Sequence, residues 1–258
     1  MTNIDAHCHA SDRWYEPVAT LLFQMDRCGV GGAVLTQMIG QFDNSYQQAC
    51  VATHSDRFAS VVLVDPKSAH ASDELAQLVD AGASGVRIGA AVDNDALWLA
   101  ASALGLAVSV SGNAAQMIAP GFTARIASCP NAAFVLEHLG GIARPDFDGS
   151  DETRAAVMAL ARFPHVSHKI TGLGQIGKRM ALANDPPIEP VAAERLLEAV
   201  AHFGAARLMW GSDFPPVASR EGYGHALGWP QRALAHLPDD QSAAIFGGNA
   251  ARVFKLKA

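Results

Sequence analysis

Short apolar runs recur along the chain, and more polar stretches separate them. The runs predict eight strands, at residues 3–7, 32–37, 60–65, 84–89, 105–111, 132–138, 165–171 and 207–213. Most runs are continuous rather than alternating, as in Val61-Val62-Leu63-Val64. Continuous apolar runs are typical of parallel strands that are buried on both faces.

Helical patterns lie between these runs. In residues 73–81, Leu75, Leu78 and Val79 share one helix face, and residues 190–204 repeat such a pattern up to a terminal glycine. Strands that alternate with helices eight times in 258 residues predict an α/β fold of the (β/α)8 TIM-barrel type, one domain over residues 1–258. The alternative is an open doubly wound sheet, but no G-x-G-x-x-G follows the first strand and no Walker A sequence is present.

The amino-acid composition excludes several classes of protein. Half of the residues are hydrophobic (50%) and 17% are charged, enough apolar material for a large core, so intrinsic disorder is excluded. Lys and Arg number 19 against 25 Asp and Glu, a net charge of −6 without a basic cluster, and we expect no nucleic-acid partner. No apolar stretch approaches the roughly 18 residues of a membrane span. We therefore expect no membrane association.

The four cysteines, Cys8, Cys28, Cys50 and Cys129, are scattered. Their spacing matches neither a zinc knuckle nor a disulfide framework, so a reducing, cytoplasmic setting is expected.

Candidate chemistry lies where the first and last predicted strands end, because the functional residues of a barrel lie at the carboxyl ends of its strands. Strand side chains alternate, so His7 and His9 point to the same side and can chelate one metal or face one substrate group. Asp213 follows the eighth apolar run and can act as a general base or a metal ligand. Taken singly, each residue also has a purely structural interpretation. His7 and His9 could be hydrogen-bonded structural histidines, and Asp213 could be the aspartate of a turn. The first and eighth strands of a closed barrel are neighbours, so all three side chains should converge.

Three further polar side chains belong to otherwise apolar strands. His138 ends the sixth and can polarise a carbonyl or orient water, or simply bond to backbone. Arg87 in the fourth is a candidate clamp for a substrate carboxylate, since an unpaired buried charge is costly. Lys169 in the seventh is a similar case. For both cations the alternative is a structural ion pair inside the barrel.

The chain resembles the amidohydrolase superfamily, in particular its amidohydrolase-2 branch. The resemblance runs from one end of the chain to the other, through six motifs: Ile4-Asp5-Ala6-His7-Cys8-His9, Gly85-Val86-Arg87, Glu137-His138-Leu139-Gly140, Lys169-Ile170-Thr171-Gly172, Trp210-Gly211-Ser212-Asp213-Phe214-Pro215 and Gly248-Asn249-Ala250-Ala251-Arg252-Val253-Phe254. The K-I-T-G and G-S-D-F-P forms look most like the group that includes 2-pyrone-4,6-dicarboxylate lactonase and the sugar-acid lactonases.

The resemblance bears on whether the protein binds a divalent metal. In the superfamily the first-strand histidines and the last-strand aspartate bind a divalent metal, helped by a Lys or His of the fifth strand. Here residues 106–113 contain no His, Lys, Asp or Glu. Two imidazoles and one carboxylate, here His7, His9 and Asp213, can still hold Zn²⁺ with an open position. The resembled group also includes lactonases thought to work without metal, so either no cofactor or one divalent metal, Zn²⁺ first, is expected.

We therefore expect a hydrolase that opens a small lactone of the sugar-acid or the pyrone or muconolactone carboxylate type. Asp213 would activate water, and His7, His9 and His138 would polarise the carbonyl. Arg87, Lys169 and Arg144 would hold the anionic or oxygen-rich periphery of the substrate. The loops at 37–45, 113–122, 172–187 and 217–225 should shape the pocket.

Two alternatives remain at this point. One is a Zn²⁺-dependent decarboxylase or hydratase of an unsaturated carboxylic acid, and the other is a barrel that binds a small anion without turnover. In each case the partner is a small carboxylate or lactone. Barrels of this type often associate, so a homo-oligomer stays open.

Overall fold

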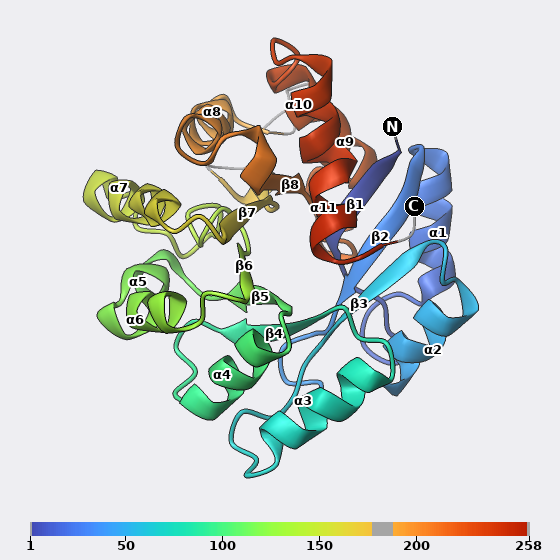
Figure 1. The fold of residues 1–258 in the computed structure, drawn as a ribbon. Helices are drawn as coiled ribbons and strands as arrows, with labels where there is room; N and C mark the ends of the chain where they lie inside the picture. Colours follow the sequence, from blue (N-terminus) through green and yellow to red (C-terminus); the bar gives the residue numbers. More distant parts are fainter. Residues whose placement is uncertain (1, 177–187, 257–258) are drawn as a thin grey trace.

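A computed structural model describes residues 2–176 and 188–256 of the chain. Eight strands form one sheet in sequence order, each parallel to the next, and helices surround them (Figure 1). The strands are β1 (Asn3–Cys8), β2 (Val30–Thr36), β3 (Phe58–Val62), β4 (Gly85–Gly89), β5 (Ala107–Ser111), β6 (Ala133–Leu136), β7 (Val166–Ile170) and β8 (Leu208–Trp210). The predicted (β/α)8 barrel is confirmed, and the open doubly wound sheet is excluded because β1 and β8 meet.

The outer layer consists of helices that follow the strands in turn. They are α1 (Val18–Arg27), α2 (Ser45–Thr53), α3 (Ala71–Asp80), α4 (Asp95–Ala103), α5 (Ala114–Ile118), α6 (Pro120–Ser128), α7 (Asp151–Met158), α8 (Val191–Phe203), α9 (Tyr223–Ala233), α10 (Asp239–Ala243) and α11 (Asn249–Val253). The helices predicted at 73–81 and 190–204 correspond to α3 and α8. Among the described residues, no helix is both long and apolar enough to cross a bilayer.

The barrel closes between β1 and β8 through backbone hydrogen bonds. Asp213 N donates to His7 O at 2.9 Å, and His9 N donates to Phe214 O at 2.8 Å. The buried carboxylate of Asp5 reinforces this seam. Its Oδ1 accepts from the backbone N–H of Ser212 at 2.8 Å and of His7 at 3.1 Å. The closure thus fixes the backbone that carries both histidines and Asp213.

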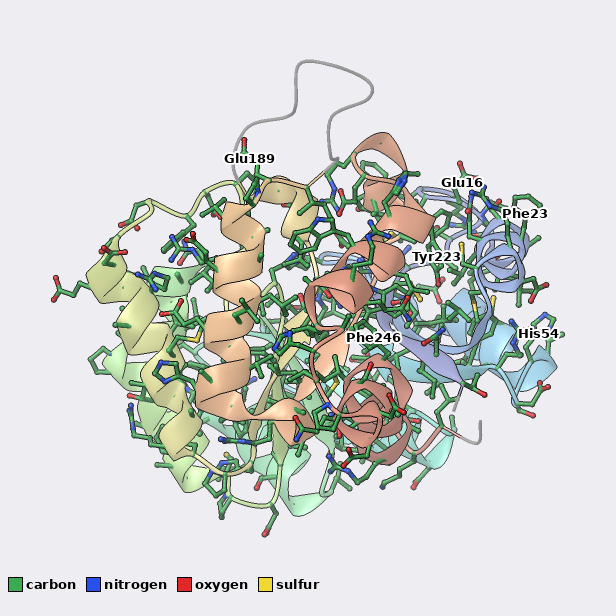
Figure 2. All side chains as sticks on the ribbon, turned by 90° about the horizontal axis from the view of Figure 1, so that it is seen from above. Glu16, Phe23, His54, Glu189, Tyr223 and Phe246 are labelled. Carbon is green, nitrogen blue, oxygen red and sulfur yellow. The ribbon has the colours of Figure 1, made fainter. Side chains whose placement is uncertain are left out.

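Asp5 itself is held on its other oxygen. The hydroxyl of Tyr223, on α9, donates to Asp5 Oδ2 at 3.0 Å. Figure 2 shows Tyr223 among packed side chains, whereas Phe23 lies at the edge of the molecule. Burial raises the pKa of Asp5 to about 6, although these hydrogen bonds lower it. The carboxyl group is therefore costly to ionise, and its hydrogen bonds offset that cost.

The barrel interior is packed with small and branched side chains, and the C-terminal segment closes its lower end. Phe254 and Leu256 cluster with Ile4, Val61 and other inward-facing residues. Figure 1 shows α11 beside β1, so the first strand and the last helix lie close together. This end of the barrel is an apolar plug, which leaves the carboxyl ends of the strands for polar chemistry.

Replacing Asp5 should reveal how much the seam depends on this carboxylate. We expect Asp5→Ala to lower the free energy of unfolding by about 2–4 kcal/mol, because it leaves three buried donors without an acceptor. Asp5→Asn keeps the acceptor oxygen for the two backbone N–H groups and should cost less than half as much. Urea unfolding followed by circular dichroism measures both. Equal losses in the two variants would contradict this role.

Candidate active site

A cleft opens at the carboxyl ends of the strands, and His9, His138 and Asp213 line it. Its volume of about 470 Å³ lies within the range of roughly 300–1,000 Å³ that is usual for small-molecule sites. Met38, Gln175 and Arg220, which also line it, come from three of the loops predicted to shape the pocket. The fourth, at 113–122, is largely helical, and Asn113 borders a different hollow. Residues 177–187 of the predicted loop at 172–187 lie outside the described residues.

The structure brings His7, His9 and Asp213 together. Asp213 Oδ1 lies 3.8 Å from His7 Nε2 and 3.9 Å from His9 Nε2. The two imidazole rings are edge to face, with centroids 5.0 Å apart. The three residues are buried, with exposed fractions of 0, 5 and 5%. One carboxylate oxygen thus faces two imidazole nitrogens across a space that a single small group can fill.

The second oxygen of Asp213 is held in place. Arg220 Nη2 donates to Oδ2 at 2.9 Å, and Gln175 Nε2 donates to it at 3.3 Å. Asp213 also has a positive φ of 61°, which turns it out of the strand direction. Oδ1 is therefore the oxygen that is free to act on a bound group. Sequence reasoning missed Arg220 and Gln175, because both lie in loops where no pattern marks them.

His9 has a defined tautomer. Its Nδ1 lies 2.6 Å from the carbonyl oxygen of Thr36, which can only accept, so we assign the proton to Nδ1. Burial, reinforced by the charge of Arg87, lowers the pKa of His9 to about 4 despite the nearby Asp213. The neutral ring therefore presents a lone pair at Nε2. This changes the role expected of His9, which is placed to accept a hydrogen bond rather than to polarise a carbonyl.

His138 reaches the cleft through an unusual backbone conformation, two residues after the end of β6. Its φ is 50°, and its ring centroid lies 5.6 Å from that of His7. Its Nδ1 is buried without a hydrogen-bond partner in the described chain. A Cβ atom at Gly172 would lie 2.6 Å from that nitrogen, so only glycine fits there. Burial lowers the pKa of His138, which favours the neutral imidazole.

Arg87 is held in an ion pair with Glu137. Its Nε donates to Glu137 Oε1 at 2.9 Å and its Nη2 to Oε2 at 2.6 Å, while Nη1 donates to Gln37 O at 2.8 Å. Burial would raise the pKa of Glu137, but the charges of Arg87 and Lys169 outweigh it and lower the pKa to about 2. Arg87 borders the cleft, but its guanidinium group is already paired with the carboxylate of Glu137. The structure therefore favours the ion-pair alternative over a free substrate clamp.

Lys169 is fully buried behind His7. Its Nζ lies 2.7 Å from Ser109 Oγ and 3.0 Å from His7 Nδ1. Burial lowers its pKa to about 8, against the opposing effect of Glu137. The Lys169 ammonium is already bonded to Ser109 and His7, and His7 lies between it and Asp213, so its position does not suit substrate contact. Ser109, on β5, was missed because nothing distinguishes a serine in an apolar strand.

Arg144 lies at the rim of the cleft. Its Nε and Nη2 donate to the two carboxylate oxygens of Asp146, at 2.9 and 3.2 Å. The side chain is about one-third exposed, at 34%. An exposed pair of this kind is weak, so Arg144 can exchange Asp146 for a substrate anion.

Three residues of the cleft could hold a metal, and their contacts decide whether they fit one. Nitrogen and oxygen atoms of His7, His9 and Asp213 lie within 4.8 Å of one another, which makes the three a candidate metal cluster. His9 Nε2 and Asp213 Oδ1 offer lone pairs. His7 does not fit this set while the Lys169 ammonium donates to its Nδ1, because the ring proton is then on Nε2. The three side chains in this arrangement therefore do not fit a divalent metal.

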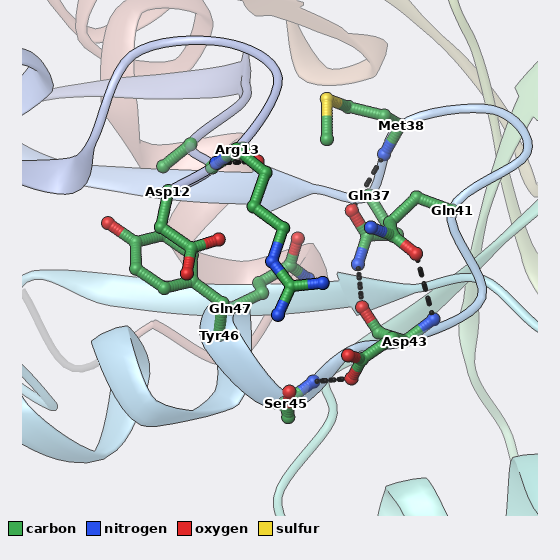
Figure 3. A pocket seen from close by; sticks show the side chains of 11 residues that line it. Asp12, Arg13, Gln37, Met38, Gln41, Asp43, Ser45, Tyr46 and Gln47 are labelled. Carbon is green, nitrogen blue, oxygen red and sulfur yellow. Dashed lines mark hydrogen bonds between the residues drawn. The ribbon is translucent and has the colours of Figure 1, made fainter.

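A second hollow lies beside the cleft, between the segment after β1 and the segment after β2 (Figure 3). Its polar groups bond to one another. Gln37 Nε2 donates to Asp43 O at 2.9 Å, and the Asp43 carboxylate accepts from Ser45 N at 3.0 Å. The hollow is only about 50 Å³ in volume, too small for a substrate-sized molecule.

Comparison with known proteins finds a matching family and two related sequences. Residues 4–256 match the protein family described as amidohydrolase. An L-fucono-1,5-lactonase of Burkholderia multivorans is 34% identical over 129 residues, which span 47% of this chain and 43% of that protein. An L-fucono-1,5-lactonase of Burkholderia ambifaria is 28% identical over 98% of this chain and 95% of its own length. These alignments place lactonases among the relatives of the chain.

A solved structure shares the fold over the full length. It is an amidohydrolase from Burkholderia multivorans with bound zinc, with a TM-score of 0.80 and 24% identity, covering 99% of this chain and 100% of that one. Zinc is thus bound by a protein of the same fold.

Arg87→Met should destabilise the protein by about 3–5 kcal/mol, because it leaves the Glu137 carboxylate buried without its cation. The matched control is Arg144→Met, which removes an exposed pair and should change stability by less than about 1 kcal/mol. Chemical unfolding of both variants measures the difference. If Arg87→Met were as stable as the control, the ion-pair role of Arg87 would be wrong.

Proposed function

The chain belongs to the amidohydrolase family, in its amidohydrolase-2 branch, and from this premise we propose that it hydrolyses a small lactone. The observation that carries the proposal is a single carboxylate oxygen, Asp213 Oδ1, which faces two imidazoles at the base of a cleft. Two relatives named L-fucono-1,5-lactonase support a lactone as the substrate.

Asp213 is the general base. Its Oδ1 takes a proton from a water molecule, whose second hydrogen is accepted by the lone pair of His9 Nε2. Arg220 and Gln175 occupy Oδ2, so the carboxylate cannot rotate away from the water. The hydroxide oxygen forms a bond to the lactone carbonyl carbon. General-base assistance of this type contributes roughly 10²–10⁴-fold.

The negative charge then develops on the carbonyl oxygen. His7 and His138, both neutral and buried, are the donors proposed to stabilise it, and such a donor is worth about 2.7–4 kcal/mol in comparable sites. When the tetrahedral intermediate collapses, the ring C–O bond breaks. Asp213 returns its proton to the leaving alkoxide, which yields the open hydroxy acid.

The rim suits a substrate with both polar and apolar surface. Arg144 offers a guanidinium to a carboxylate or hydroxyl group, and we assign it, rather than Arg87 or Lys169, to the periphery of the substrate. Trp14 and Ile39 line the opening and are largely exposed, at 77 and 69%. They can cover the carbon face of a lactone ring.

A second candidate is metal-dependent turnover of an unsaturated carboxylic acid, by decarboxylation or hydration. The observation in its favour is the cluster of His7, His9 and Asp213. There Zn²⁺ would supply an activated water. The position of Lys169 opposes it, because it directs the His7 proton toward the place that the metal would take.

Asp213→Asn should abolish hydrolysis while the fold is retained. An amide cannot take the proton, so we expect kcat to fall by about 10²–10⁴-fold. Proton release with a pH indicator measures this over sugar-acid γ- and δ-lactones and pyrone and muconolactone carboxylates. Asp240→Asn, at an exposed position of α10, is the matched control and should retain full activity.

The same assay with a chelator separates the two candidate functions. Lactone hydrolysis that persists after chelation supports Asp213 as the base. Hydrolysis by Asp213→Asn at nearly the wild-type rate would rule out this mechanism. Stoichiometric zinc, with no lactone hydrolysed, would favour the metal-dependent candidate.

A further inference from the structure

His7 and His9 point into the same space, but different groups hold them from behind. His9 donates its Nδ1–H to the Thr36 carbonyl oxygen. His7 Nδ1 instead lies 3.0 Å from an amine, Lys169 Nζ. The direction of that hydrogen bond decides which nitrogen of His7 carries the proton.

The hydrogens of the surrounding network make Lys169 a donor toward Ser109. Glu137 is a carboxylate and can only accept, and it receives the hydroxyl hydrogen of Ser109 at 2.7 Å. Ser109 has no second hydrogen, so its oxygen accepts from Lys169 Nζ at 2.7 Å. Lys169 therefore acts as a donor in this network. An ammonium group has no lone pair, so it also donates to His7 Nδ1.

The surroundings of Lys169 favour the ammonium form. The carboxylate of Glu137 bonds to the same Ser109 hydroxyl as Lys169, and the centroid of the Phe254 ring lies 5.4 Å from Nζ. The face of an aromatic ring attracts a cation. Arg87, which pairs with Glu137, is the opposing charge nearby.

We propose that Lys169 is a positioning residue that fixes His7 as the Nε2–H tautomer, so that the two histidines present one donor and one acceptor to the cleft. The His7 Nε2 atom is buried and has no hydrogen-bond partner among the described residues. An unpartnered buried N–H is costly, and a substrate oxygen would remove that cost. His7 is thus one of the two oxyanion donors, beside His138, and His9 holds the water. The catalytic part of this inference rests on the proposed function.

The same contact disfavours a metal. A cation on His7, His9 and Asp213 needs a lone pair at His7 Nε2. The hydrogen bond from Lys169 to Nδ1 leaves the ring proton on Nε2, so that lone pair is not available. Removing the ammonium releases that restriction, because His7 can then move its proton to Nδ1. Lys169 therefore selects between a hydrogen-bonding site and a metal-binding site built from the same three side chains.

The first test is the tautomer itself, read from two-bond ¹H–¹⁵N spectra of protein labelled with [¹⁵N]histidine and assigned with His7→Gln and His9→Gln. We expect the Nε2–H pattern for His7 and the Nδ1–H pattern for His9 in the unmodified protein. In Lys169→Met the His7 signals should move to the Nδ1–H pattern or to a mixture. Lys67→Met, the same change at an exposed position, should leave both histidines unchanged.

The second test measures zinc affinity by calorimetry. Lys169→Met should bind Zn²⁺ about 10–100-fold more tightly than the unmodified protein, the usual size of an effect exerted through a ligand's hydrogen-bond partner. On a lactone substrate, the variant should lose about 10²–10³-fold in kcat with KM nearly unchanged.

An Nδ1–H pattern for His7 in the unmodified protein overturns the proposal even if Lys169→Met does not fold. So does a folded Lys169→Met protein that keeps the Nε2–H pattern and the zinc affinity of the unmodified protein. Neither measurement uses a lactone. A failed lactone assay beside the expected spectra would therefore refute the proposed function and leave the tautomer assignment standing.

Discussion

The polar interior of this barrel depends on one buried carboxylate, Glu137. It accepts two hydrogen bonds from the Arg87 guanidinium and one from the Ser109 hydroxyl, so both of its oxygens are bonded. Because the Ser109 hydrogen is committed to Glu137, the serine oxygen must accept from Lys169, and Lys169 in turn contacts His7. A charge that would be costly to bury alone thus becomes the start of a chain of hydrogen bonds that ends at the cleft.

A second constraint comes from the seam between the first and last strands. Parallel strands supply backbone hydrogen bonds along most of the barrel, but β1 and β8 meet over only a short stretch, and Asp5 completes the closure with its own carboxylate. The residues that flank this seam, His7 and Asp213, are the ones that face each other across the cleft. Closing the barrel and assembling the site are therefore the same structural event.

The resulting site is asymmetric, although its two first-strand histidines look equivalent in sequence. A carbonyl oxygen lies behind His9 and an amine behind His7, and these partners decide which nitrogen of each ring carries hydrogen. The asymmetry suits acyl transfer from a lactone, where one group must accept from water while another donates to the carbonyl oxygen. A metal site would instead require lone pairs from both rings. The family is compatible with either chemistry, so the partners behind the ligands carry the distinction.

The sequence by itself determined the barrel and the location of the site. Eight apolar runs with intervening helical patterns specify parallel strands, and the period of two along a strand puts His7 and His9 on one side. It also placed Asp213 at the end of the strand that must neighbour the first. What it left open were the partners of the charged residues, since Arg87 and Glu137 are 50 residues apart and Lys169 and His7 are 162 apart. Periodicity shows from which face of a strand a side chain projects. The direction of a hydrogen bond depends on partner atoms that only the closed barrel brings within 3 Å of each other. Tertiary structure alone therefore decided that Arg87 pairs within the protein, that Lys169 lies behind His7, and that Arg220 holds Asp213.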